Sequence, residues 1–202
     1  MPFKIDTIET DNLSVNGTQI TENGGLPYKV YTALLTQSGT DTESTINSGS
    51  LTIGVTYTVN QNSPGMDFTN VGAPNNNLGT KFVATGTIPN SWGEGATYTL
   101  AYSEGAPVVT ALENTIGNIW FTYQGNGFYF INSNGLFTIN KTWGFSVSVF
   151  AGTTGIIEPI SIDISGAGGS EPPNTINIRL QGGDFGGDDL LNKTPIEIRV
   201  YN

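Results

Sequence analysis

Apolar and polar residues alternate along much of this chain, and the alternation is clearest between residues 106 and 143. Within that stretch, an apolar run at 119–123 (IWFTY) and another at 128–131 (FYFI) flank the short segment Gly125-Asn126-Gly127. Gly and Asn tolerate the positive φ angles that tight hairpin turns require. We therefore predict a β-hairpin here, in the most aromatic and β-branched part of the chain.

The same period of two residues recurs before and after this hairpin. Further strand candidates are 28–35, 51–59, 66–71, 78–85, 96–102, 143–150, 156–164, 176–180 and 195–201. Polar segments rich in Gly and Asn separate them, and we predict loops at 40–50 and 181–192. Strands with one apolar and one polar face are typical of antiparallel sheets that are exposed on one side. The sequence therefore predicts an all-β fold made of antiparallel sandwich or barrel modules.

Residues 1–27 carry a thinner pattern, in which single apolar residues are spaced through a polar stretch. The apolar positions are Phe3, Ile5, Ile8, Leu13, Val15 and Ile20. One copy of so narrow a stripe cannot form a core, whereas several copies wound together can bury it. We predict a thin N-terminal arm or shaft used in assembly, and an ordinary edge strand is the alternative.

Length and charge narrow the classes of function. With 202 residues the chain is long enough for one β-rich domain or two small ones. Its 17 acidic and 7 basic side chains give a net charge of −10. This balance disfavours nucleic acid as a partner, and equally an anionic membrane surface. We also find no apolar run of the length of a membrane span and no apolar core of a signal peptide at the first residues.

The chain contains neither Cys nor His. This excludes disulfides, thiolate and imidazole metal ligands, Cys nucleophiles and His-based triads, so no cofactor is expected. Paired carboxylates could still cleave glycans, but no pattern places two of them at the required separation. The glutamates that lie in or beside predicted turns are Glu94, Glu104, Glu113, Glu158 and Glu171. We expect no catalytic residue and a non-enzymatic protein.

The most acidic segment is Gly-rich and spans residues 182–189, with carboxylates at Asp184, Asp188 and Asp189. Gly-rich turns with close carboxylates can wrap Ca²⁺. The spacing matches neither an EF-hand nor a repeated calcium-binding array, so a solvated turn is the preferred interpretation. Whether the segment from Asp184 to Asp189 binds an ion stays open, and no metal ligand is assigned.

The three tryptophans, Trp92, Trp120 and Trp143, could stack on sugar rings. We interpret Trp120 and Trp143 as core or subunit-interface residues, because they lie in the most apolar strands. Trp92 lies in a Gly-, Pro- and Asn-rich loop, which favours an exposed ring. It is the one residue that we single out as a candidate receptor contact.

Four segments carry a resemblance to known proteins. They are YKVYTALLTQSG (28–39), APVVTALENTIGNIWFTY (106–123), NKTW (140–143) and TPIEIRVYN (194–202). Together they resemble structural proteins of tailed-bacteriophage virions, of fibre or decoration type, as found in phages of Bacteroidetes-like hosts. Residues 65–92 resemble a second recurrent phage module, which has an acidic pair at its start. Here position 66 is Met, so only Asp67 remains of that pair, which weakens a metal site there.

The resemblance implies a discontinuous host β domain, 28–39 plus 106–202, interrupted by a small inserted β module at 40–105. It also implies a location in the virion, as a head-fibre or tail-associated fibre subunit. Such a subunit would form a homotrimer and would dock on capsid or tail proteins through residues 1–27. The alternative is a glycan- or receptor-binding module of the virion, which would contact a glycan on the host surface.

Overall fold

The computed structural model describes most of the chain between residues 27 and 146 and the C-terminal segment. The described residues are 13–15, 18–20, 27–95, 97, 99–138, 140–146, 149–151, 156–158, 160–165, 175–180 and 191–202. They form β-strands and a single 3-10 helix, η1 (Thr69–Val71), and no α-helix occurs among them. The all-β prediction is confirmed. The strands make antiparallel sheets, none of which closes into a barrel in the described part of the chain.

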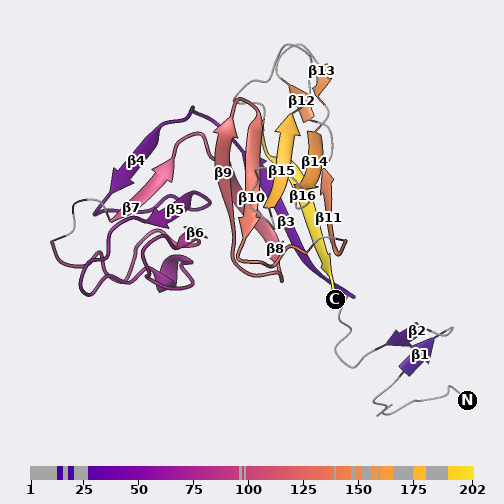
Figure 1. Cartoon of the computed structure of the whole chain (residues 1–202), viewed down its shortest axis with the longest axis horizontal. Helices are drawn as coiled ribbons and strands as arrows, with labels where there is room; N and C mark the ends of the chain where they lie inside the picture. Colours follow the sequence, from indigo (N-terminus) through magenta and orange to yellow (C-terminus); the bar gives the residue numbers. More distant parts are fainter. Residues whose placement is uncertain are drawn as a thin grey trace, which may run out of the picture.

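The first sheet pairs the strand that begins at Tyr28 with the C-terminal strand of the chain. Its strands, in the order β11-β16-β3-β8, are β11 (Thr142–Ser146), β16 (Thr194–Tyr201), β3 (Tyr28–Thr36) and β8 (Val108–Asn114). Strands β3 and β16 pair antiparallel from Tyr28↔Tyr201 to Leu35↔Thr194. In Figure 1 the yellow strand β16 accordingly lies beside the indigo strand β3.

The second sheet contains the predicted hairpin. Its order is β14-β15-β10-β9, with β14 (Ile160–Ser165), β15 (Thr175–Leu180), β10 (Phe128–Ser133) and β9 (Ile119–Gly125). Strands β9 and β10 pair antiparallel through a two-residue turn, and Gly127 in that turn has a φ of +64°. This positive φ is the conformation for which Gly is suited, and the hairpin prediction is confirmed.

The first two sheets pack face to face around the larger hydrophobic core. Alternation along β9 and β10 turns Ile119, Phe121, Tyr129 and Ile131 to the inside. The facing sheet contributes Tyr31, Ala33, Leu35, Val109, Ile196 and Ile198. The result is an antiparallel sandwich whose inner residues are removed from water.

A third sheet lies beside the sandwich, at the left in Figure 1. Its order is β4-β7-β5-β6, with β4 (Glu43–Ile46), β7 (Leu100–Ser103), β5 (Thr56–Val59) and β6 (Lys81–Val83). It has a second core, which includes Tyr57, Val59, Phe68, Phe82 and Leu100. All members of this second core fall within residues 51–100. That residues 40–105 form an inserted unit separate from the host domain stays a prediction.

Three sequence predictions in this region need correction. Residues 66–71 do not form a strand: after Phe68 the chain turns into η1, which ends at Gly72 with a φ of +110°. The turn brings Val71 into the same core as Phe68, whereas a strand would have placed it on the opposite face. The predicted strand 51–59 begins only at Thr56, and the predicted loop 40–50 contains β4. Along β4, exposed residues alternate with residues that are only half-buried.

The remaining strands form two small antiparallel pairs. They are β1 (Leu13–Val15) with β2 (Thr18–Ile20), and β12 (Val149–Ala151) with β13 (Ile156–Glu158). The first pair belongs to the predicted arm at 1–27, most of which lies outside the described residues. The acidic segment from Asp184 to Asp189 also lies outside them.

Candidate functional site

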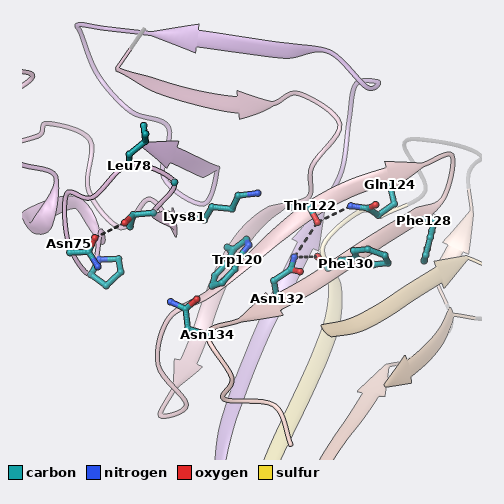
Figure 2. A pocket seen from close by; sticks show the side chains of 13 residues that line it. Asn75, Leu78, Lys81, Trp120, Thr122, Gln124, Phe128, Phe130, Asn132 and Asn134 are labelled. Carbon is teal, nitrogen blue, oxygen red and sulfur yellow. Dashed lines mark hydrogen bonds between the residues drawn. The ribbon is translucent and has the colours of Figure 1, made fainter. Parts of the chain in front are cut away.

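A groove of about 800 Å³ lies between the sandwich and the third sheet. One wall is the outer face of the hairpin β9–β10, and the other is the loop and strand start at 74–81. Figure 2 shows Trp120 and Phe130 on the hairpin side, with Leu78 and Lys81 on the opposite side. The groove therefore combines residues that are far apart in the sequence.

The hairpin wall follows from the alternation that builds the core. Because Ile119 and Phe121 point inward, Trp120 and Thr122 project from the other face of β9. The register places Trp120 opposite Asn132 and Thr122 opposite Phe130 on β10. Aromatic and polar side chains thus lie next to each other across the two strands.

The polar side chains of this wall are linked by hydrogen bonds. The amide groups of Asn132 and Gln124 each donate to the Thr122 hydroxyl, with N···O distances of 3.2 Å. The rings of Phe128 and Phe130 meet edge to face, with centroids 5.1 Å apart. These contacts hold the hairpin wall in one arrangement, and the dashed lines in Figure 2 mark the hydrogen bonds.

The opposite wall is a turn braced by its own side chains. The Asn75 side chain accepts a hydrogen bond from the backbone N–H of Asn77 at 2.9 Å, and the Gly79 N–H donates to the Val59 carbonyl at 2.8 Å. Leu78 projects from this turn and is 65% exposed. A large apolar side chain is thereby presented at the rim of the groove.

Close to the groove, two hydrogen bonds join the third sheet to β9 and the residue before it. The Asn118 amide donates to the Lys81 carbonyl at 2.9 Å. The backbone N–H of Phe121 donates to the buried Thr56 hydroxyl at 3.1 Å. The third sheet is therefore attached directly to the edge strand β9.

Lys81 is the one charged residue among the described residues that line the groove. It also lines a smaller cavity of about 270 Å³, together with Asp41 and Glu43. No carboxylate is found among the described residues of the larger groove. Nor do the described residues contain a group of three or more acidic side chains arranged to hold a metal ion. The groove therefore offers aromatic and amide contacts with one positive charge.

Trp92 lies outside the groove, and its ring is half-buried, where the sequence favoured an exposed ring. The indole N–H donates to the Gly49 carbonyl at 3.2 Å, and the ring packs edge to face on Phe68 with centroids 5.5 Å apart. Trp92 thus packs against the core of the third sheet. Its role as a receptor contact stays a prediction.

The other two tryptophans differ from each other. Trp143 is 56% exposed on the outer face of β11, so it is not a core residue of this chain. Trp120 is half-buried and lines the groove. The alternation in β9 could have indicated this position, because it places Trp120 on the face opposite the core.

Asp67 serves the local structure of its own loop. Its carboxylate accepts hydrogen bonds from the Thr69 N–H at 2.9 Å, the Thr69 hydroxyl at 2.7 Å and the Asn90 amide at 2.9 Å. These bonds stabilise the charged form, with the Thr69 hydroxyl as the largest cause, and they hold the pKa of Asp67 well below its usual range. The carboxylate closes an Asx turn that leads into η1.

The described residues contain no helix long and apolar enough to cross a membrane. No protein-family model matches the chain, and neither a curated protein nor a solved structure shows significant similarity to it.

Proposed function

We propose that this chain is a non-enzymatic structural protein of a tailed-phage virion, a head-fibre or tail-associated fibre subunit. Residues 1–27 dock it on the particle, and the β domains project. The observation that carries this proposal concerns the four segments that resemble phage structural proteins. Although they are spread from residue 28 to residue 202, each contributes residues to the sheet β11-β16-β3-β8, and the segment 106–123 continues into β9 of the facing sheet. Segments that are distant in the sequence but adjacent in one sandwich support a shared structural module.

The outer face of this sheet supports a role in assembly. Leu112, Trp143 and Phe145 are 63%, 56% and 45% exposed on it. Large apolar side chains gathered on one surface mark sites of protein association. We propose that neighbouring copies in a homotrimer, or other virion proteins, cover this face.

Arg199 organises the same face from strand β16. Its guanidinium lies 4.7 Å from the ring centroid of Tyr28 and 5.1 Å from that of Phe145. Glu197 pairs with Arg199, and this hydrogen bond is the largest cause that raises the pKa of the guanidinium. Arg and aromatic residues are the residue types enriched where proteins associate.

The experiment has two parts, both made on the full chain. Light scattering coupled to gel filtration should show an oligomer, and the double variant Trp143→Ser, Phe145→Ser should shift it towards monomer. Ile88→Ser is the matched control, since Ile88 is 71% exposed but lies in the third sheet's loops.

In phage particles, deletion of residues 1–26 should abolish incorporation. If purified wild-type particles do not contain this chain, the virion role is refuted.

A second candidate function is a glycan- or receptor-binding module of the virion. The groove at Trp120 favours it, because a purely structural protein needs no such lined recess beside its core. Host-glycan binding by the purified chain without residues 1–26 separates the two candidates: a binding module keeps it, whereas a purely structural subunit shows none.

A further inference from the structure

We infer that the groove between hairpin β9–β10 and residues 74–81 binds an oligosaccharide, which contacts the Trp120 indole and places an acidic substituent near Lys81. This inference deepens the second candidate function and rests on it. The sequence listed Trp120 among the tryptophans that could stack on sugar rings, but it did not place Trp120 opposite Lys81.

The size of the groove suits a small ligand. Its volume of about 800 Å³ lies in the upper part of the range that protein sites for small ligands occupy. Two separate walls line the open groove, so a ligand can contact both. A flat sheet face alone would not offer this.

The hairpin wall has the chemistry that sugars need. A pyranose ring has apolar C–H faces and a rim of hydroxyl groups, so it requires aromatic surface and bifunctional hydrogen-bonding groups side by side. Trp120 is paired with Asn132 across the two strands, and Gln124 is exposed two steps further along the same face of β9. Carboxamides both donate and accept, which matches hydroxyl groups of either orientation.

Both walls are already ordered before a ligand arrives. The Thr122 hydroxyl fixes Asn132 and Gln124, and the Asn75 side chain braces the opposing turn. Less conformational entropy is lost on binding when the contacting side chains are held in place.

Charge decides which ligands are favoured. The chain has a net charge of −10, yet Lys81 is the one charged residue among the described residues of the groove. Its ammonium group can attract a uronic-type carboxylate locally. The described lining residues include no carboxylate pair, so the groove supports binding of the sugar chain without its cleavage.

The test is calorimetric titration of the purified full chain with three probes: an oligogalacturonate, a chito-oligosaccharide and a malto-oligosaccharide of six units each. We expect saturable binding of the oligogalacturonate, and binding of a neutral probe alone would overturn the role of Lys81. Trp120→Ala should weaken it about tenfold, because it removes the main aromatic contact. Gln124→Ala, a change of an exposed side chain, repeats the test without disturbing the core. Lys81→Gln should weaken oligogalacturonate about threefold and leave the neutral probes unchanged.

Trp143→Ala is the matched control, because it removes the same residue type from the outer face of the other sheet. It should leave sugar binding unchanged while it lowers self-association, so that the two proposals fail separately. Absence of binding to all three probes would overturn the inference. Sugar binding that survives both Trp120→Ala and Gln124→Ala would also overturn it. The same holds if the groove binds no sugar and instead binds an unfolded polypeptide, such as reduced carboxymethylated lactalbumin.

Discussion

The backbone N–H of Val109 donates a hydrogen bond to the carbonyl of Gly54, with an N···O distance of 2.9 Å. This bond joins the turn before β5 to strand β8 and so links the third sheet to the sandwich. Gly54 is buried and has a φ of +88°, and a Cβ added there would lie 2.2 Å from the Val109 carbonyl oxygen. The two backbones can approach this closely only because position 54 has no side chain.

Gly54→Ala should therefore destabilise the chain strongly. A positive φ costs a non-Gly residue about 1–2 kcal/mol, and the clash with Val109 adds to it, so we expect roughly 3–5 kcal/mol in urea unfolding. Gly49→Ala is the control, since Gly49 has a similar φ of +85° with open space around it. It should cost only the backbone strain, about 1–2 kcal/mol. Equal losses in the two variants would show that the close approach is unimportant.

Thr56→Val should leave the buried N–H of Phe121 without its acceptor. Valine keeps the shape of threonine but cannot accept a hydrogen bond, and an unsatisfied buried N–H costs about 1–3 kcal/mol. The measurement is urea unfolding together with hydrogen exchange of the Phe121 amide, which should become faster. Thr56→Ser keeps the acceptor and should retain slow exchange. Slow exchange in Thr56→Val would contradict the assignment of this bond.

The contribution of Asp67 to stability should depend on pH. Its folded-state pKa lies below the unfolded value of about 3.9, so its stabilising effect is fully present above that pH. The effect is lost as the pH falls from about 4 towards the lowered folded-state pKa. We expect the difference in unfolding free energy between wild type and Asp67→Asn to shrink over this interval. A difference that stays constant from pH 7 to pH 3 would contradict the prediction.

Trp92→Ala should destabilise the third sheet by about 2–4 kcal/mol, because it removes a large ring from the edge of a core. Trp92→Phe keeps an aromatic ring against Phe68 and loses the hydrogen bond to Gly49, which costs about 1 kcal/mol. Thermal unfolding should show that Trp92→Ala is less stable than Trp92→Phe. If Trp92→Phe instead remained stable and lost adsorption to host cells, a receptor contact would be supported.

Much of the fold could be predicted from local pattern. The hairpin of β9 and β10 follows from two apolar runs around a Gly–Asn–Gly segment, and β3 and β16 follow from clean alternation. The helical turn η1 could not be recognised, because Met66 and Phe68 keep the spacing of a strand and only Val71, three residues after Phe68, departs from it. The groove was missed for a different reason. Alternation places Trp120 away from the core, but it does not say what faces that side.

The sequence by itself determined the class of this protein: strands of period two, frequent Gly and Asn turns, and no Cys or His for the chemistry that needs them. These properties are local, because which side of a strand is apolar depends only on neighbouring residues. Only the tertiary structure decided that β16 inserts between β11 and β3, and that Lys81 lies across a groove from Trp120. Such pairings depend on which faces cover one another and on close backbone contacts such as Gly54 with Val109. An alternating pattern fits many partners equally well, so it cannot choose among them.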